Sequence, residues 1–161
     1  MKAVALKAYL PISNPESLVD VSLDKPTPTG HDLLIAIDAI SVNPVDTKVR
    51  KPKDKIENNY RVLGWDAVGR VVATGSDVTL FKTGDQVYYA GDISRPGSNS
   101  EFQLVDERIV GHKPKSLNNA QAAAIPLTAI TAWEGLFDRL RIPQEQNTKP
   151  KTLLIIGGAD G

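Results

Sequence analysis

The fold is indicated most clearly by GWDAVGRVVATGSDVTLFKTGDQVYYAG, residues 64–91. Extended, β-branched residues fill 68–73, Gly75-Ser76-Asp77 supplies a turn, and 85–89 resumes the extended pattern after Gly84. Glycines stand near the strand ends, where the chain has to reverse. The stretch therefore predicts neighbouring antiparallel strands in a barrel or sandwich rather than helices.

Short strands separated by turns also occupy the chain before this stretch. Pro26 to Gly30 is predicted to be a turn, because its prolines donate no ladder hydrogen bonds and its glycine tolerates a positive φ. Polar Asp38 and Ser41 interrupt a long β-branched run, which predicts a strand bulged near its middle and ended by Asn43-Pro44-Val45-Asp46. The charged stretch 50–60 is predicted to be a solvated loop. The strands expected here are 3–6, 19–23 and 33–42.

Beyond residue 91 one more hairpin is expected, at 102–105 and 108–110, and then the periodicity changes. Asn118 is an N-cap candidate with Gln121 three residues later, so a helix is predicted to begin there. A second helix is expected from Pro126, with cations near its end before Pro143. Its apolar stripe would consist of Leu127, Ile130, Trp133, Phe137 and Leu140.

The last apolar run is TLLII, at 152–156, and it leads directly into glycines. A short continuous apolar run is typical of a buried parallel strand, which needs neighbours on both edges. One interpretation is the first strand of a nucleotide-binding βαβ unit that continues beyond residue 161. The alternative is a lone strand added to the barrel. A glycine turn after a strand lets the backbone approach a pyrophosphate, but the motif is weak by itself.

Composition excludes several classes of protein. The length of 161 residues predicts one hydrophobic core. The 19 Lys and Arg residues balance 19 Asp and Glu residues, so no excess charge favours nucleic acid or an anionic membrane. The absence of Cys removes disulfides, thiolate metal sites and cysteine nucleophiles, and no 18 apolar residues run together. We expect a cytoplasmic protein with neither nucleic acid nor membrane as its partner.

Four blocks of sequence resemble the N-terminal half of the medium-chain dehydrogenase/reductase superfamily, in particular its quinone oxidoreductase and zinc-type alcohol dehydrogenase-like group. Several spaced blocks in the right order are more specific than any one of them, and together they cover essentially the whole chain. The blocks are SVNPVDTK at 41–48, LGWDAVGRV at 63–71 continuing through Gly75, Val78, Gly84-Asp85 and Val87, AAIPLTAITA at 123–132, and LIIGGADG at 154–161.

The resemblance implies a mainly β fold with α elements. Residues 1–125 would form a GroES-like β-barrel catalytic domain, and 126–161 a linking helix with the first strand and glycine turn of a truncated Rossmann domain. The implied reaction is hydride transfer from NADPH, with NADH not excluded, to a quinone or α,β-unsaturated carbonyl. Since much of the cofactor domain is lacking, residues 1–161 alone are expected neither to bind cofactor tightly nor to turn over. The full-length protein is expected to be a homodimer, as is usual in the family.

Two departures from the family's zinc-dependent members bear on a metal site. Those enzymes place a Cys where this chain has Asn43 and a His-Glu pair where it has Trp65-Asp66, and their structural-zinc lobe needs four Cys. A catalytic zinc takes about three protein ligands, and no His and Asp cluster replaces them here. His31 and His112 are expected to be surface or capping residues. The sequence therefore predicts no metal site and zinc-independent chemistry.

The resemblance also supplies the candidate site residues. Asn43 is the candidate catalytic residue and a candidate nicotinamide contact, although Asn-Pro after a strand is also ordinary turn chemistry. Thr128 is a second candidate cofactor contact, or simply an early helix hydroxyl. Gly158 and Gly161 match the phosphate turn, and Trp65 is either a wall of the substrate pocket or a core residue. Without a metal, hydrogen bonds or ordered water must stabilise the developing enolate, and no general acid is identified.

Three functions from different classes are compatible with these residues. The first is the NADPH-dependent quinone or enone reductase. The second is a non-catalytic GroES-like binding module, because a fold does not determine a function. The third is an enoyl-thioester reductase of the same superfamily. The dinucleotide turn favours the two reductases over the binding module.

Overall fold

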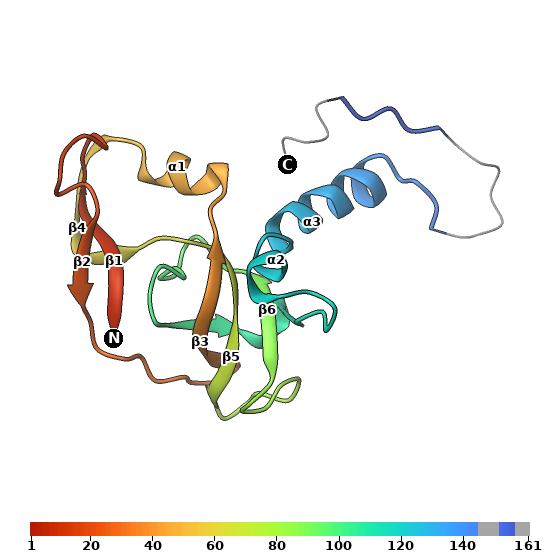
Figure 1. The fold of residues 1–161 in the computed structure, drawn as a ribbon, viewed down its shortest axis with the longest axis horizontal. Coiled ribbons are helices and arrows are strands. Elements are labelled where there is room, and N and C mark those ends of the chain that lie inside the picture. The colour runs from red at the N-terminus through yellow and green to blue at the C-terminus, as the bar shows by residue number, and fades with distance from the viewer. Residues whose placement is uncertain (145–151, 157–161) are drawn as a thin grey trace.

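The computed structural model describes residues 1–144 and 152–156. Figure 1 shows a β-barrel with a helical segment that leaves it on one side. The helices are α1 (Pro44–Arg50), α2 (Asn119–Ala123) and α3 (Pro126–Trp133), with a 3₁₀ turn η1 (Glu107–Ile109) and a π-helical turn η2 (Glu134–Arg139). The strands are β1 (Lys2–Tyr9), β2 (Val19–Ser22), β3 (Asp32–Ser41), β4 (Lys53–Val62), β5 (Asp66–Thr74), β6 (Gln86–Ala90), β7 (Phe102–Asp106) and β8 (Val110–His112).

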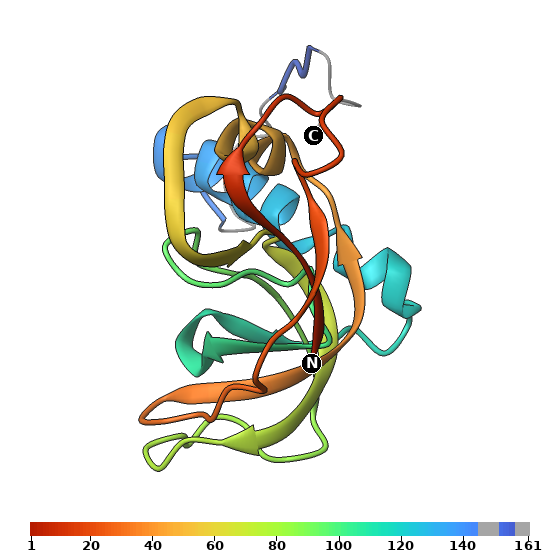
Figure 2. The same ribbon diagram turned by 90° about the vertical axis from the view of Figure 1, so that its left-hand side faces the viewer.

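The strands form two antiparallel sheets. The smaller has the order β2-β1-β4 and the larger the order β7-β3-β5-β6-β8. An isolated bridge between Ala3 and Ser100 joins β1 to the segment that precedes β7. Figure 2 shows α1 at one end of the barrel and the turns before β3 and between β5 and β6 at the other. The predicted mainly β architecture is thus confirmed.

The core of the larger sheet comes from inward-facing residues of β3, β5, β6 and β7. Leu33 and Ile35 of β3 belong to this core, and Leu34 between them is also buried. The register of β3 against β5 shifts between Leu34 and Ile35 and again between Ile37 and Ala39. This confirms the bulged strand that the polar interruptions predicted. The buried cluster is Leu33, Ile35, Ala67, Val71, Val87, Tyr89 and Val105.

The predicted helix starts are also confirmed. Asn118 caps α2 through its side chain, which accepts a hydrogen bond from Gln121 N–H at 2.9 Å, while the Gln121 side chain accepts one from Asn118 N–H at 3.1 Å. This reciprocal pair satisfies two amides that the helix itself leaves free. Ala122 and Ala123 of α2 pack against Val68 of β5. This buried contact holds the helix against the barrel.

Two predictions of secondary structure are wrong, and one helix was not predicted. The stretch predicted as a solvated loop at 50–60 is mostly β4, an edge strand that pairs irregularly with β1. Most of its side chains are exposed, so its sequence shows no alternation of apolar and polar residues from which a strand could be predicted. The predicted end of the strand at Asn43 to Asp46 is confirmed, because β3 ends at Ser41, but α1 then begins at Pro44 and was not predicted, since seven residues are too short for a clear helical period. The strand predicted at 108–110 is largely η1, and β8 begins only at Val110.

The run at 152–156 does not form the expected strand in the described part of the chain. Leu153, Leu154, Ile155 and Ile156 are 44%, 81%, 66% and 88% exposed. The physical reason is that a parallel strand needs a hydrogen-bonded neighbour, and residues 1–144 offer it none. Within the two described ranges, none of the helices has the length and apolar character that crossing a membrane demands.

Candidate functional site

Asn43 lies in the two-residue connection between β3 and α1. Its backbone is extended, with φ −124° and ψ 162°, and its N–H donates to the Asp46 carboxylate at 2.7 Å. That bond ties the start of α1 to the residue before it, as in a capping box. Asn43 is only 8% exposed, so its side chain is directed into the protein rather than into a solvated turn.

The side chain of Asn43 donates from Nδ2 to Asp66 Oδ2 at 2.8 Å. The strand pairing explains this contact, because Ser41 at the end of β3 lies opposite Asp66 at the start of β5. Asn43, two residues further along, is thereby carried over the end of β5. Asp66 itself is fully buried. The sheet register thus brings together two polar side chains that are 23 residues apart.

The second oxygen of the same carboxylate binds the start of α3. Leu127 N–H donates to Asp66 Oδ1 at 2.9 Å. Pro126 opens the helix without an N–H, so Leu127 carries the first backbone donor that α3 leaves unsatisfied. A carboxylate here is favourable because a helix N-terminus carries partial positive charge. Asp66 therefore links the barrel, the Asn43 segment and the helical segment.

The environment of Asp66 shifts its acidity. Burial is the main influence and raises the pKa of Asp66 above its ordinary value. Hydrogen bonds from Asn43 and Leu127 act against this by stabilising the anion, while the negative charge of Asp46 adds to the increase. In the described residues Asp66 has no cationic partner, so neutral donors alone compensate its charge.

Thr128 follows Leu127 and lies one residue from the Asp66 contact. Its hydroxyl donates back to the helix entry, with Ala124 O at 3.1 Å and Ile125 O at 3.0 Å. This is the local bonding of an early helix hydroxyl, and it leaves the oxygen of the hydroxyl with acceptor capacity. The tertiary structure thus brings Asn43 and the start of α3 together through Asp66. The role of Thr128 as a cofactor contact stays a prediction.

Trp65 is packed as a core residue. It is 1% exposed and clusters with Leu6, Tyr9 and Leu63. Its indole N–H donates to Asp92 O at 3.1 Å, which satisfies its one polar group. The packing gives the predicted substrate-pocket role no support, and that role stays a prediction. Gly158 and Gly161, predicted to bind the cofactor phosphates, lie outside the described residues.

The donor set around Asn43 does not fit a zinc ion. Zinc takes thiolate, imidazole or carboxylate ligands, about three of them in a catalytic site. Both Asp66 oxygens already accept N–H bonds, one Asp46 oxygen does the same, and Trp65 supplies only a donor. No group of three His, Cys, Asp or Glu residues suited to a metal occurs in 1–144 or 152–156.

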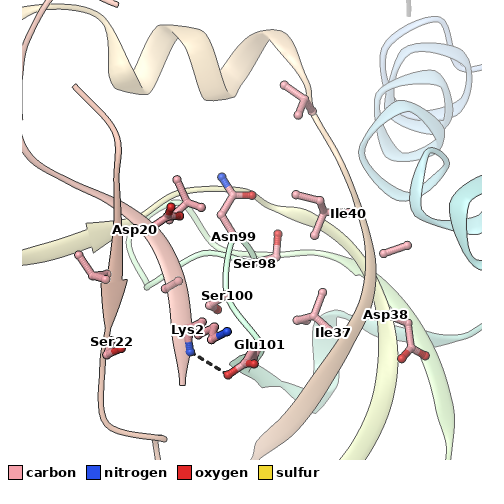
Figure 3. Close-up of a pocket in the computed structure, with 15 residues that line it drawn as sticks. Lys2, Asp20, Ser22, Ile37, Asp38, Ile40, Ser98, Asn99, Ser100 and Glu101 are labelled. Atoms are coloured by element: carbon pink, nitrogen blue, oxygen red, sulfur yellow. Dashed lines mark hydrogen bonds between the residues drawn. The ribbon is translucent and has the colours of Figure 1, made fainter. Parts of the chain in front are cut away.

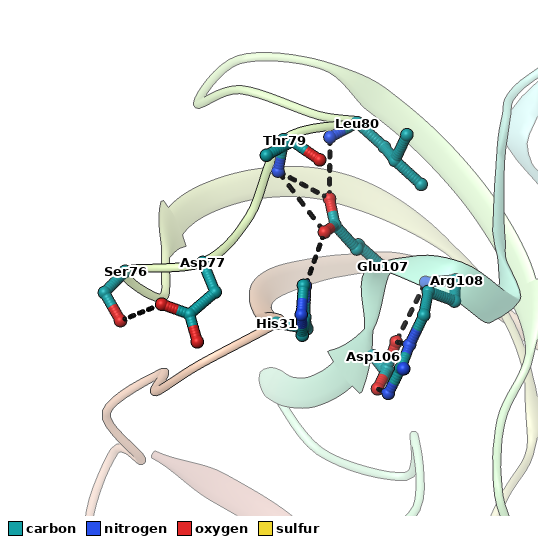
Figure 4. A network of polar contacts seen from close by, with 8 residues as sticks. All are labelled: His31, Ser76, Asp77, Thr79, Leu80, Asp106, Glu107 and Arg108. Atoms are coloured by element: carbon teal, nitrogen blue, oxygen red, sulfur yellow. Dashed lines mark hydrogen bonds and ion pairs between the residues drawn. The ribbon is translucent and has the colours of Figure 1, made fainter.

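The two histidines lie at other positions. His112 stacks on Phe81, with 4.8 Å between ring centroids. His31 binds Glu107 through Nδ1 at 2.8 Å, and the same buried carboxylate accepts from Thr79 N–H and Leu80 N–H. Figure 4 shows these groups converging on Glu107 from separate segments. The network joins the turn before β3 to the loop after β5, so its evident role is to hold that end of the barrel together.

Burial and hydrogen bonding have opposite effects on Glu107. Burial alone raises the pKa of a carboxyl group, but here the hydrogen bonds from Leu80 N–H, His31 and Thr79 N–H outweigh it and leave the pKa of Glu107 below its ordinary value. Next to this network, the Arg108 side chain donates hydrogen bonds to both carboxylate oxygens of Asp106 and holds the pKa of that carboxyl well below its usual range. Both carboxyl groups therefore favour the ionised state in the folded protein.

A groove of about 910 Å³ opens between β1 and β2 on one side and β3 on the other. Figure 3 shows Ser98, Asn99 and Ser100 between these walls. The groove extends to Val42, which precedes Asn43 in the chain, whereas Asn43, Asp66 and Thr128 are not among the residues that line it. Within the described residues, the buried Ser98 Oγ and Asn99 Oδ1 have no hydrogen-bond partner. The apolar residues that line the groove include Ala3, Val4, Val21, Ile37, Ala39, Ile40 and Val42.

The helical segment beyond the site carries an exposed apolar face. Ile130, Trp133 and Leu140 are 56%, 55% and 61% exposed, and the Trp133 and Phe137 rings lie 4.6 Å apart. The stripe predicted from spacing is therefore present, but most of its large side chains are not covered by the barrel. Figure 1 shows why, since α3 extends away from the strands.

Reasoning from the sequence missed the role of Asp66. The available signal was an acidic residue at the start of an otherwise apolar strand, in GWDAVG, where a buried carboxylate needs partners. Identifying those partners required the register of β3 against β5 and the position of α3, which are tertiary facts. Asp46 forms no ion pair in the described structure, and its Oδ2 accepts from Asn43 N–H.

Comparisons with known proteins identify a family and several relatives. The family model of the alcohol dehydrogenase GroES-like domain matches residues 29–115. A zinc-type alcohol dehydrogenase-like protein of Staphylococcus epidermidis is 45% identical over 163 residues, covering 100% of this chain and 48% of that protein. The chain thus spans about half the length of this curated relative.

Solved structures share the fold. A Rhizobium etli CFN 42 protein, provisionally named a zinc-dependent alcohol dehydrogenase, is 58% identical with a TM-score of 0.83, over 87% of this chain and 41% of that one. The quinone oxidoreductase of Coxiella burnetii is 29% identical with a TM-score of 0.72, over 84% and 44%. A mycobacterial protein solved with NADPH is 27% identical with a TM-score of 0.75, over 88% and 42%.

Proposed function

Since the chain belongs to the alcohol dehydrogenase GroES-like domain family of the medium-chain dehydrogenase/reductase superfamily, we propose that it forms the substrate side of a nicotinamide-dependent oxidoreductase. The proposed reaction is hydride transfer from NADPH to a quinone or an α,β-unsaturated carbonyl, without zinc. The relatives support an oxidoreductase in general, because they include both alcohol dehydrogenase-like proteins and a quinone oxidoreductase.

The observation that carries this proposal is the Asp66 carboxylate, which holds Asn43 and the start of α3 together where the barrel meets the helical segment. Asn43 is a polar group where β3 ends and β5 begins, and Val42, the residue before it in the chain, lines a groove with largely apolar walls. Polar groups placed beside apolar surface are what a site for a flat, weakly polar substrate requires.

The residues present fit the nicotinamide end of the cofactor. Asn43 retains a second Nδ2 hydrogen as a donor, and the Thr128 oxygen retains acceptor capacity, so both can meet the hydroxyl and carboxamide groups of a nicotinamide nucleoside. When bound, the cofactor supplies the hydride. The exposed face of Ile130, Trp133 and Leu140 fits a covering second domain. Gly158 and Gly161 stay proposed phosphate contacts.

In this proposal the chain's own residues bind, orient and stabilise. Reduction of an enone or quinone builds negative charge on the substrate oxygen, and a preorganised N–H donor in a water-poor site lowers the energy of that charge. Asn43 is the candidate donor, because its side chain is nearly buried and held by Asp66. The apolar walls of the groove would exclude water and orient the ring of the substrate.

Zinc independence is part of the proposal and rests on the donor set described above. It has a direct check: the complete natural polypeptide, dialysed against a chelator, is expected to keep its NADPH-dependent reduction of 1,4-benzoquinone. Stoichiometric zinc that survives dialysis, or activity restored only by added zinc, would contradict it.

We further propose that residues 1–125 form the catalytic domain and that the start of the cofactor domain follows at 126–161. We also propose a homodimeric state and a cytoplasmic location for the protein.

The main experiment is a titration of NADPH into the complete natural polypeptide, followed by fluorescence, with turnover measured on 1,4-benzoquinone, an α,β-unsaturated ketone and an enoyl thioester. Binding with turnover of the first two substrates supports the proposal. Preference for the thioester would favour the related enoyl-thioester reductase. Neither binding nor turnover would favour a non-catalytic binding module. Residues 1–161 alone serve as the control and are expected to show no tight binding.

A further inference from the structure

The Asp66 carboxylate binds two separate segments of the chain, which is more than filling a buried position requires. Each of its oxygens accepts one hydrogen bond, from Asn43 Nδ2 at 2.8 Å and from Leu127 N–H at 2.9 Å. It is fully buried without a cationic partner in the described part of the chain. Burying an ionisable group is unfavourable unless its bonds compensate, so an apolar residue would be the simpler way to fill this position.

The carboxylate determines which way the Asn43 amide faces. An ionised carboxylate only accepts hydrogen bonds, whereas an amide has one donating and one accepting end. If the Asn43 amide were rotated by half a turn, its Oδ1 would face Asp66 Oδ2, and two acceptors would meet in a buried space. Asp66 therefore fixes Nδ2 inward, which turns Asn43 Oδ1 toward the Asp46 N–H of the capping box and leaves the second Nδ2 hydrogen for a ligand.

The same group determines where α3 starts relative to Asn43. Leu127 is the second residue of α3 and directly precedes Thr128. Because one carboxylate binds both Asn43 and Leu127, the candidate nicotinamide contacts Asn43 and Thr128 are held near a common point although 85 positions, from 43 to 128, separate them in the sequence. A shift of about 1 Å in such a placement can lower a rate by about 100-fold.

We infer that Asp66 is a positioning residue of the hydride-transfer site: it sets the donor and acceptor orientation of the Asn43 amide and fixes the start of α3 beside it. The inference rests on the proposed function, since it concerns groups that would face cofactor and substrate. Asp66 itself touches neither in this account and acts only through Asn43 and Leu127.

The test compares Asp66→Asn with a swapped pair. In Asp66→Asn, the new amide must turn its oxygen to Leu127 N–H and its nitrogen to Asn43, which forces the Asn43 amide to reverse. In Asn43→Asp/Asp66→Asn, the hydrogen bond between the two positions is restored with donor and acceptor exchanged. The swap recovers the packing and bonding but leaves position 43 without any N–H donor.

In the complete natural polypeptide, with NADPH and 1,4-benzoquinone, Asp66→Asn is expected to lower kcat/KM by about 10- to 100-fold. The melting temperature is expected to recover in the swapped pair while kcat/KM stays low. If Asp66 were merely structural, kcat/KM in Asp66→Asn would fall no further than in a control variant of equally lowered melting temperature, which would overturn the inference; the low kcat/KM of the swapped pair reports only the lost Asn43 donor. Unchanged kcat/KM in Asp66→Asn would also overturn it. Asp32→Asn is the matched control, because its ion pair with Arg95 lies elsewhere and only stability should fall.

A second readout is independent of activity. The side-chain amide NMR signals of Asn43 are expected to shift in Asp66→Asn and to stay in place in Asp32→Asn. If the parent protein neither binds NADPH nor turns over, the proposed function fails, yet these signals still decide whether Asp66 orients Asn43. Unshifted Asn43 signals in Asp66→Asn would overturn the positioning role even in an active enzyme.

Discussion

The carboxylate of Glu107 and the imidazole of His31 meet at 2.8 Å, although 76 positions separate the two residues in the sequence. Glu107 is almost completely buried and also accepts hydrogen bonds from Thr79 N–H and Leu80 N–H. Figure 4 shows that this places one carboxylate at the meeting point of three chain segments. One buried ionisable residue therefore links three segments at the end of the barrel opposite α1.

Glu107→Gln is expected to lower the melting temperature by several degrees at pH 7. The amide offers one accepting oxygen where the carboxylate offers two, so one of the donors from Thr79, Leu80 and His31 loses its partner. Thermal unfolding followed by circular dichroism measures the change. The matched control is Glu101→Gln, whose carboxylate accepts only an exposed bond from Lys2 N–H, and it should shift the transition little.

The effect of Glu107→Gln is also expected to depend on pH. The pKa of Glu107 is lowered in the folded state, so ionised Glu107 stabilises the fold above the carboxyl group's unfolded pKa. This contribution is lost as the pH falls through the lower, folded pKa, where the native carboxyl takes up a proton. Denaturant unfolding at a series of pH values should show the two proteins converging in acid. A stability difference that is constant with pH would count against the role of the ionised form.

Gly64→Ala and Gly84→Ala form a matched pair. Both glycines have a positive φ, +94° and +98°, so alanine strains the backbone at either position. A methyl group at Gly64 would also lie 2.5 Å from Asn99 Oδ1 and 2.7 Å from Ser98 Oγ, whereas Gly84 has open space. We expect losses of about 2–4 kcal/mol at Gly64 and about 1–2 kcal/mol at Gly84. Denaturant unfolding measures both variants. Equal losses in the free energy of unfolding would show that the contacts with Asn99 and Ser98 add no destabilisation at Gly64.

The two tryptophans should behave differently. Trp65→Ala removes a side chain that is 1% exposed and is expected to lower the free energy of unfolding by about 3–5 kcal/mol. Trp133→Ala removes a side chain that is 55% exposed and contacts Phe137, so about 1 kcal/mol or less is expected. Urea unfolding of both variants measures the difference. A mild effect at position 65 would contradict its placement in the barrel core.

Ser98→Ala tests the unsatisfied hydroxyl beside the groove. Ser98 is 1% exposed and its Oγ has no partner within the described residues, so alanine should be neutral or stabilising by up to about 1 kcal/mol. Ser100→Ala is the contrast, because Ser100 Oγ donates to Phe102 O at 2.8 Å and its loss should destabilise by about 1 kcal/mol. Denaturant unfolding ranks the two, and a clear loss at Ser98 would indicate a bound water or other partner there.

Local chemistry accounts for the features that the sequence predicted well. Asn118 with Gln121 marks a helix start because each side chain satisfies a free amide of the other. The β-branched run around Asp38 marks a bulged strand, because polar interruptions in a buried strand displace the ladder. The strand β4 escaped prediction for the converse reason, since an edge strand with exposed side chains has no burial pattern to show.

Within the candidate site, the sequence alone determined the residue types: an amide rather than a thiol at position 43, a tryptophan rather than a histidine at 65, and hence an unsuitable set of zinc ligands. The tertiary structure alone decided which groups meet. Asp66 acquires its partners from residues 23 and 61 positions away because the β3 and β5 register and the docking of α2 bring them there. The physical reason is that side-chain chemistry belongs to each residue, whereas distances between remote residues are set by packing of the whole chain.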